Sequence, residues 1–208
     1  TLASEAARKA LEQAGKRAEE IDLILVATCS PEQYLPCCAC QVQAAVGAVN
    51  ALAFDVNAAC SGFLFALNTA DAYLRMGLAE NALIIGSEVL SKLVDWTDRS
   101  SCILFGDGAG AVVVEQCGTE SRAVEYGNAL PVVEEKRIPA AGILGRSLHS
   151  DGTGGGVLQC GARELTTPYA GTSAAKTDQN QPTNDREHYI QMDGQEVYRF
   201  CLLYTSPS

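Results

Sequence analysis

The chain has 208 residues, of which 47% are hydrophobic and 19% charged, and its formal net charge is −10. This composition is typical of a soluble globular protein with one sizeable core. The acidic balance, without clusters of Lys or Arg, argues against nucleic acid or an anionic membrane as a partner. No apolar run reaches the roughly 18 residues that a membrane-spanning helix needs, and no signal peptide is recognisable.

The first elements alternate between helix and strand. Apolar residues over 2–14 recur at helical spacing, and Gly15 ends that pattern. The apolar run at 21–28 is rich in β-branched residues and predicts a strand buried on both faces. An Ala-rich second helix is predicted over 38–49, and a second strand over 52–56.

The alternation continues through the middle of the chain. A long helix is predicted over 60–76 and another buried strand over 82–86. Two further strands, at 102–106 and 109–114, are expected around a glycine turn. Apolar strands that alternate with helices predict a layered α/β architecture.

Composition divides the chain into parts. Residues 1–117 are dense and regular, whereas 118–200 are rich in Gly, Thr, Asn and Asp and predict loops around a site, then the start of a second half. The last residues, 201–208, do not continue the helix predicted from Gly194 and are expected to be a non-native tail. Thr1 leads directly into a helix pattern, so we expect the N-terminus to be a cut edge. The tail at 201–208 leads to the same expectation for the C-terminus.

Nine cysteines is an odd and high number. Disulfide frameworks belong to small secreted chains, so we expect reduced thiols and a cytoplasmic location. Cys37 and Cys40 form a C-x-x-C pair. A structural zinc site needs four ligands, and no second pair follows, so no metal is expected. A redox or metal-binding module at this pair is a weaker alternative.

The most informative segment is FDVNAACSGFLFALNTA, at 54–70. A buried strand is expected to end at Val56, after which Cys60 opens the long helix. A helix start carries unpaired N–H groups and the positive end of the macrodipole, which stabilise a thiolate and an oxyanion. On spacing alone, however, Cys60 is equally consistent with one more buried cysteine. Small residues beside it leave room for a substrate: Ala58, Ala59, Ser61 and Gly62.

Several blocks together identify a family. They are LILVATCS (23–30), P-x-x-A-C-Q-V-Q (36–43), FDVNAACSGFLFAL (54–67), ALIIGSEVLS (82–91), DWTDR (95–99), FGDGAGAVVVE (105–115), LHSDGTGGG (148–156) and YIQMDGQEVYRF (189–200). In order and approximate spacing they resemble 3-oxoacyl-(acyl-carrier-protein) synthase III, a family of thiolase-like condensing enzymes. The resemblance covers about four-fifths of the chain.

The resemblance implies a thiolase-like layered αβαβα fold, of which this chain holds the first half and the start of the second. It also implies an acyltransferase that initiates fatty-acid biosynthesis. Cys60 would take an acyl group from acyl-CoA, and malonyl-acyl-carrier protein would then decarboxylate and attack the acyl-enzyme to give a 3-oxoacyl-carrier protein. Acyl-CoA is a substrate, no cofactor is expected, and the family implies a homodimer.

Further positions carry over from the family one at a time. Cys29 stands where the family often has threonine, Leu35 matches a residue that closes the partner subunit's pocket, and Arg99 matches a contact to the CoA nucleotide. The alternative for the apolar positions is core packing, and for Arg99 a solvated charge. Acyl-pocket residues are matched by Leu90, Phe105, Leu158, Ile190 and Met192.

The glycine-rich segments GDGAG (106–110) and DGTGGG (151–156) lack the order and the lysine of a phosphate-binding loop, so both are expected to be turns. The family's catalytic histidine and asparagine motifs have no counterpart, and His149 and His188 do not match them. We therefore expect the chain alone to be inactive in condensation. The alternatives are a degenerate, non-catalytic interaction protein of the same fold and a related condensing enzyme of secondary metabolism.

Overall fold

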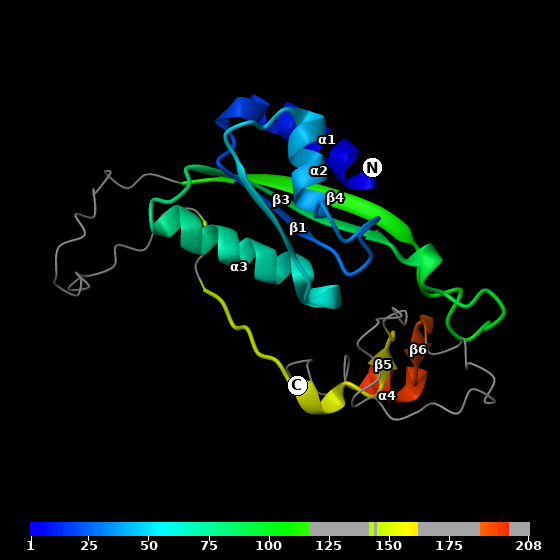
Figure 1. Ribbon diagram of the computed structural model, residues 1–208. Helices are drawn as coiled ribbons and strands as arrows, with labels where there is room; N and C mark the ends of the chain where they lie inside the picture. Colours follow the sequence, from blue (N-terminus) through cyan, green and yellow to red (C-terminus); the bar gives the residue numbers. More distant parts are fainter. Residues whose placement is uncertain (117–141, 144, 162–187, 200–208) are drawn as a thin grey trace, which may run out of the picture. The chain divides into compact units, whose positions relative to one another are not determined.

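A computed structural model of the chain describes residues 1–116, 142–143, 145–161 and 188–199 (Figure 1). The chain divides into two units, each described by itself. The first consists of Thr1–Glu88 and Asp107–Leu148, and the second of Val89–Gly106 and His149–Ser208. The boundaries expected after residues 117 and 200 fall outside the described residues and stay predictions.

The first unit is built on a four-stranded sheet in the order β2–β1–β3–β4. The strands are β1 (Leu23–Ala27), β2 (Leu52–Val56), β3 (Asn81–Val89) and β4 (Asp107–Glu115). β1 pairs in parallel with both neighbours, so that Leu25 lies opposite Phe54 in β2 and Ile84 in β3. This inner position explains why all five residues of β1 are buried, as the apolar run predicted.

Helices cover both faces of this sheet (Figure 1). α1 (Leu2–Ala14) and α2 (Cys38–Val46) pack on one face, and α3 (Gly62–Arg75) packs on the other. Alternate residues of β1 point to opposite sides, so Ile24 belongs to the α1–α2 core and Leu25 to the α3 core. The layered α/β class expected from the sequence is therefore confirmed.

Side chains fix where the first two helices begin and end. Thr1 caps α1 by accepting a hydrogen bond from the Ser4 N–H at 3.1 Å. Gly15 ends the helix in the left-handed region, at φ 63°, which suits a residue without Cβ. The Asp55 carboxylate of β2 accepts bonds from the N–H groups of Cys38 (2.9 Å) and Ala39 (2.7 Å), and so caps α2.

Three expectations about strands and turns are wrong. Residues 102–106 form no strand: 102–104 belong to a turn in which the N–H groups of Ser101 and Cys102 bond to the carbonyl of Asp98. The segment expected to be a glycine turn instead begins β4, with Gly108 and Gly110 inside the strand. β2 is an edge strand whose residues are half-buried or exposed, rather than a buried strand.

The second unit contains shorter elements. They are η3 (Leu90–Lys92), η4 (Gly152–Gly154), β5 (Leu158–Gln159), β6 (Gln191–Met192) and α4 (Gly194–Tyr198). β5 and β6 pair antiparallel. The turn expected at DGTGGG is confirmed as η4, where Asp151 accepts a hydrogen bond from the Thr153 N–H at 2.9 Å. The helix expected from Gly194 is confirmed as far as Tyr198.

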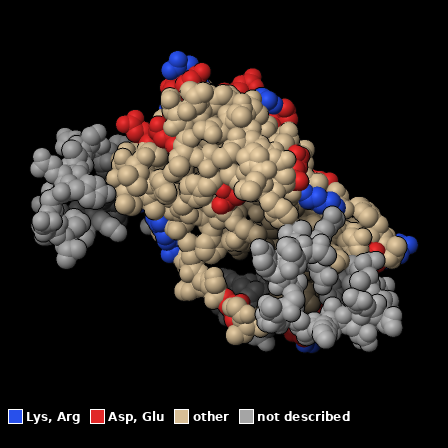
Figure 2. All heavy atoms as spheres, in the orientation of Figure 1, with Lys and Arg blue, Asp and Glu red and all other residues tan. Residues whose placement is uncertain are grey.

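The described surface carries mixed charge. On the face shown in Figure 2, Lys and Arg side chains lie scattered among Asp and Glu side chains. Within the described ranges, no helix is long and apolar enough to cross a membrane.

Candidate active site

Cys60 lies in a short turn between β2 and α3. The turn is the 3-10 segment η2 (Ala59–Ser61), and α3 begins only at Gly62. The expectation that Cys60 itself opens the long helix is therefore wrong by two residues. The reason is the hydrogen bonding of the turn, in which the N–H groups of Ser61 and Gly62 bond three residues back, to the carbonyls of Ala58 and Ala59, as in a 3-10 helix. The Cys60 side chain is exposed, which argues against the reading of a buried structural cysteine.

The backbone before Cys60 is strained, because Ala59 has a φ of 43°. A non-glycine residue at positive φ costs about 1–3 kcal/mol and persists only where its surroundings determine it. The Asn57 side chain contributes by accepting a hydrogen bond from the Ala59 N–H at 3.5 Å, and the Ser61 N–H bonds to the Ala58 carbonyl at 3.1 Å. Such strain is concentrated at functional sites, which makes this turn a candidate site on structural grounds.

The start of α3 is pressed against the end of β1. A Cβ at Gly62 would lie only 3.1 Å from the Ala27 Cβ, so a glycine permits this close approach. Ser61, in the N-cap position of α3, makes no side-chain cap hydrogen bond. The N-terminal end of the helix, with its positive dipole end, is thus held beside the turn that carries Cys60.

Three parallel strands end at the same edge of the sheet, and a polar side chain lies at or just beyond the end of each. Cys29 follows β1, Cys60 follows β2 and Glu88 lies near the end of β3. Because the carboxyl ends of parallel strands meet at one edge, residues far apart in sequence meet there. Cys60 lies close enough to Cys29 to raise the pKa of the Cys29 thiol slightly.

Glu88 organises the segment after β1. Its carboxylate accepts hydrogen bonds from the Cys29 N–H (2.9 Å), the Thr28 hydroxyl (3.4 Å) and the hydroxyl of Ser30. The Cys29 Sγ also donates to it, at 3.5 Å. Sequence reasoning missed Glu88, although its place at the end of a predicted parallel strand was a usable signal.

The two neighbouring thiols differ in chemistry. Burial, the charge of Glu88 and the hydrogen bond to Glu88 together raise the pKa of Cys29 to about 11. Cys29 is therefore a neutral thiol at physiological pH, and a neutral thiol is a poor nucleophile. The Cys60 side chain is open to solvent. Of the two thiols at this edge, Cys60 is the more accessible.

The other predicted site residues are divided between the units. Leu35 belongs to the first unit and is 85% exposed. The second unit holds the rest, and it brings Leu158 and Met192 directly opposite each other across β5 and β6. Ile190 is 7% exposed, and its N–H bonds to the Leu93 carbonyl at 2.8 Å, just beyond η3. Leu90 and Phe105 are half-buried.

Arg99 lies in a turn held by its neighbour. The Asp98 carboxylate accepts bonds from the Ser100 N–H (2.9 Å) and the Ser101 hydroxyl (3.0 Å), which fix the turn on both sides of Arg99. The Arg99 side chain is exposed. Both readings of Arg99, an anion contact and a solvated charge, are compatible with this exposure.

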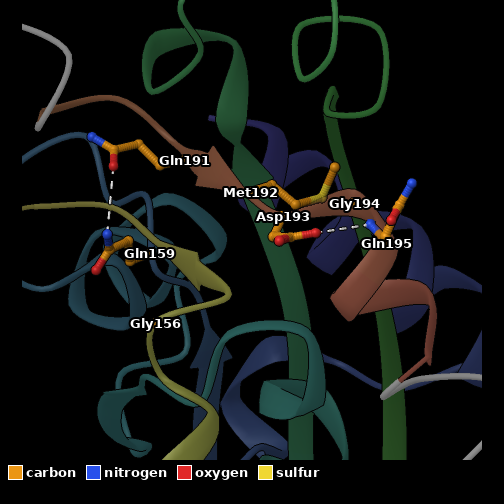
Figure 3. A pocket seen from close by; sticks show the side chains of 7 residues that line it. All are labelled: Gly156, Gln159, Gln191, Met192, Asp193, Gly194 and Gln195. Carbon is orange, nitrogen blue, oxygen red and sulfur yellow. Dashed lines mark hydrogen bonds between the residues drawn. The ribbon is translucent and has the colours of Figure 1, made fainter.

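A hollow of about 670 Å³ lies in the second unit (Figure 3). Asp193 there accepts hydrogen bonds from the N–H groups of Gln195 and Glu196, both at 3.1 Å, and Gln159 donates to Gln191 at 3.4 Å. Met192 belongs both to this lining and to the predicted acyl pocket. The other lining residues escaped sequence reasoning, because strands of two residues leave no periodic signal. The lining residues are Gly156, Gln159, Gln191, Met192, Asp193, Gly194 and Gln195.

The remaining candidates add little to the site. His149 is exposed and His188 half-buried, and both belong to the second unit. Searching only the described residues gives no group of three or more His, Cys, Asp or Glu side chains able to hold a metal ion.

Comparison with known proteins gives consistent matches. The family model of 3-oxoacyl-[acyl-carrier-protein (ACP)] synthase III matches residues 54–130. The beta-ketoacyl-[acyl-carrier-protein] synthase III of Clostridium acetobutylicum is 41% identical over 97% of this chain and 52% of its own length. That of Anaplasma marginale is 48% identical over 82% of this chain and 48% of its own.

A solved structure agrees with these sequence matches. The 3-oxoacyl-[acyl-carrier-protein] synthase III of Aquifex aeolicus superposes with a TM-score of 0.69 at 36% identity, covering 95% of this chain and 50% of its own. The chain therefore spans about half the length of the curated relatives it matches.

Proposed function

Because the chain belongs to the 3-oxoacyl-[acyl-carrier-protein] synthase III family, we propose that it is an acyltransferase whose nucleophile is Cys60. Its thiolate attacks the carbonyl carbon of an acyl-CoA thioester, the carbon–sulfur bond to CoA breaks, and CoA leaves as a thiol. The acyl group remains on Cys60 as a new thioester. In the complete enzyme, malonyl-acyl-carrier protein decarboxylates and condenses with this acyl group to give a 3-oxoacyl-carrier protein.

The contrast between Cys29 and Cys60 carries this proposal. Two thiols meet at one edge of the sheet, but the pKa of Cys29 is raised to about 11. Cys60 is exposed, follows the strained Ala59 and precedes the N-terminal end of α3. The helix dipole favours the negative charge that develops on the oxygen of an attacked thioester at this place.

The substrate residues form a second part of the proposal. Leu90, Phe105, Leu158, Ile190 and Met192 would line the acyl chain, with Cys29 near the reacting thioester. The exposed guanidinium of Arg99 suits the phosphates of the CoA nucleotide, since Arg binds phosphate by charge-assisted hydrogen bonds. The exposed Leu35 suits a contact with a second copy of the chain in a homodimer.

The proposed reaction requires no cofactor, because acyl-CoA is consumed as a substrate. All the cysteines that the structure describes are free thiols. Free thiols of this number suit a reducing compartment, which supports the proposal of a cytoplasmic enzyme.

The first half-reaction tests this proposal without the carrier protein. The full chain is mixed with acetyl-CoA, and released CoA is followed by chromatography, with Cys60→Ala and Cys29→Ala as paired variants. We expect the wild-type chain and Cys29→Ala to release CoA and Cys60→Ala to release none. Circular dichroism checks that both variants fold alike. Undiminished release by Cys60→Ala, or no release by the wild-type chain, contradicts the proposal.

A further inference from the structure

A pair of thiols outside the proposed active site lies at the start of α2. Cys37 occupies the N-cap position of this helix, and Cys40 follows three residues later. Residues three apart on a helix are neighbours on its surface. The Cys37 and Cys40 sulfur atoms lie 3.4 Å apart, so the two thiols are in contact. Neither is used by the proposed acyl transfer.

The surroundings of the pair hold both partners in place. The Asp55 carboxylate caps the first turn through the N–H groups of Cys38 and Ala39. The Cys40 sulfur also lies 3.7 Å from the Ala53 carbonyl oxygen of β2. Both Cys37 and Cys40 are only half-buried, so small reagents can reach them.

The cysteine between them is unsuited to pairing. Cys38 is buried, and burial together with the charge of Asp55 raises the pKa of its thiol to about 11. Residues two apart on a helix do not face each other, so Cys38 cannot replace Cys37 as the partner of Cys40. The geometry therefore selects one pair out of the three cysteines in this turn.

We propose that Cys37 and Cys40 form a reversible disulfide, with glutathione disulfide or a similar small disulfide as the oxidant. The Cys37 thiolate attacks one sulfur of glutathione disulfide, releases one glutathione thiol and forms a mixed disulfide. The Cys40 thiolate then attacks the Cys37 sulfur and releases the second glutathione. The protein pair loses two electrons and two protons, and one glutathione disulfide becomes two glutathione thiols.

The order of attack follows from the environment of each thiol. The hydrogen bond with Cys37, followed by burial, raises the pKa of Cys40. The Cys40 sulfur also lies against the Ala53 carbonyl oxygen, so Cys40 is the more confined of the two thiols. Cys37 is therefore the attacking thiol and Cys40 the resolving thiol. A C-x-x-C pair at the start of a helix is a known arrangement for thiol–disulfide exchange.

Redox titration of the full chain tests this pair independently of acyl transfer. The chain is equilibrated in glutathione buffers of increasing oxidised fraction, free thiols are blocked with N-ethylmaleimide, and the peptides are mapped by mass spectrometry. We expect Cys37 and Cys40 to lose alkylation together, in one peptide that carries an internal disulfide, and to regain it with dithiothreitol. Joint alkylation of both residues at every buffer ratio overturns the proposal.

Matched variants identify the pair and the order of attack. Cys38→Ala, in the same turn, should keep the disulfide, whereas Cys40→Ser should leave Cys37 trapped as a glutathione mixed disulfide. Cys37→Ser should remove the disulfide and leave Cys40 open to alkylation. A disulfide that persists in Cys37→Ser through Cys38 contradicts the assignment, as does a stable mixed disulfide on Cys37 in the wild-type chain. Circular dichroism of each variant checks that α2 remains folded.

Discussion

Different interactions stabilise the interior of each unit. Both clusters of buried apolar side chains in the described part of the chain belong to the first unit, where Leu23, Ile24 and Leu25 are fully buried. In the second unit, aspartates repeatedly accept hydrogen bonds from the backbone two residues on, as Asp98 does from Ser100 and Asp151 from Thr153. The first unit is thus fixed by packing, and the second largely by local polar turns.

This difference bears on the proposed chemistry. Cys60 follows a strand of the packed sheet and precedes a helix that is pressed against β1. The proposed acyl-chain residues Leu158 and Met192 lie on strands of only two residues. We infer that the nucleophile is rigidly placed, whereas the residues proposed to choose the acyl chain lie on elements that sequence change alters more easily.

The largest expected effect comes from opening the core of the first unit. Ile84 of β3 is fully buried, and Ile84→Ala should lower the free energy of unfolding by about 2–5 kcal/mol. Met192→Ala in the second unit should cost much less, because Met192 is only half-buried. Urea titration followed by circular dichroism measures both losses. Equal losses would remove the distinction between the two units.

The next effect concerns the thiol of Cys29. With its pKa raised from 9.0 to about 11, Cys29 carries about a hundredfold less thiolate at neutral pH than an unshifted cysteine. Its alkylation by iodoacetamide should therefore be slow at pH 7 and rise until about pH 11. Peptide mass spectrometry across this pH range gives the rate at each residue, and fast labelling at pH 7 would show that the shift is absent.

Replacing Glu88 sharpens the same measurement. The negative charge of Glu88 disfavours the Cys29 thiolate, so Glu88→Gln should lower the pKa of Cys29. Burial is the largest cause of the shift and remains in this variant, so the pKa should stay above 9.0. An unchanged alkylation profile would show that the carboxylate does not act on Cys29.

A smaller loss is expected at the cap of α2. Asp55→Ala removes the acceptor for the N–H groups of Cys38 and Ala39 and should cost about 1–2 kcal/mol of stability. Asp55→Asn keeps an acceptor oxygen and should lose less. Both values come from urea titration, and an Ala variant as stable as wild type would exclude the capping role.

The smallest effect is expected on the surface of α3. Arg75 pairs with Asp71 at 2.7 Å, one helical turn apart. Arg75→Ala should change stability by only about 0.3–0.5 kcal/mol, because the Arg75 guanidinium is half exposed to water and salt and Asp71 keeps its ion pair with Arg146. Thermal unfolding at low and high salt measures the difference, which should shrink as salt is added. A loss that grows with salt would contradict an electrostatic origin.

Packing patterns made the first unit predictable. β1 and β3 are recognisable in the sequence as apolar, β-branched runs. α1 is recognisable by its helical spacing and by the glycine that ends it. The segment 102–106 misleads because its apolar residues Ile103 and Leu104 are exposed on a turn set by Asp98. Local periodicity cannot reveal that hydrogen bonds to Asp98 hold a turn against the apolar pattern.

The candidate site was predictable only in part. Cys60 is prominent in sequence because small residues surround it between a strand and a helix. The positive φ of Ala59 and the raised pKa of Cys29 depend on backbone geometry and on neighbours distant in sequence. The spacing of Cys37 and Cys40 predicts that they are neighbours on the helix, but the 3.4 Å separation of their sulfur atoms is a property of the folded structure.

The proposed acyl transfer requires that Cys60, and no other thiol, accepts the acyl group. The most direct measurement is peptide mapping of the full chain after brief exposure to acetyl-CoA at neutral pH, with each cysteine-containing peptide weighed separately. We expect an acetyl group on Cys60, removed by hydroxylamine as a thioester is, and unmodified Cys29. Acetylation of Cys29 in preference to Cys60, or equal acetylation of all exposed thiols, would contradict it.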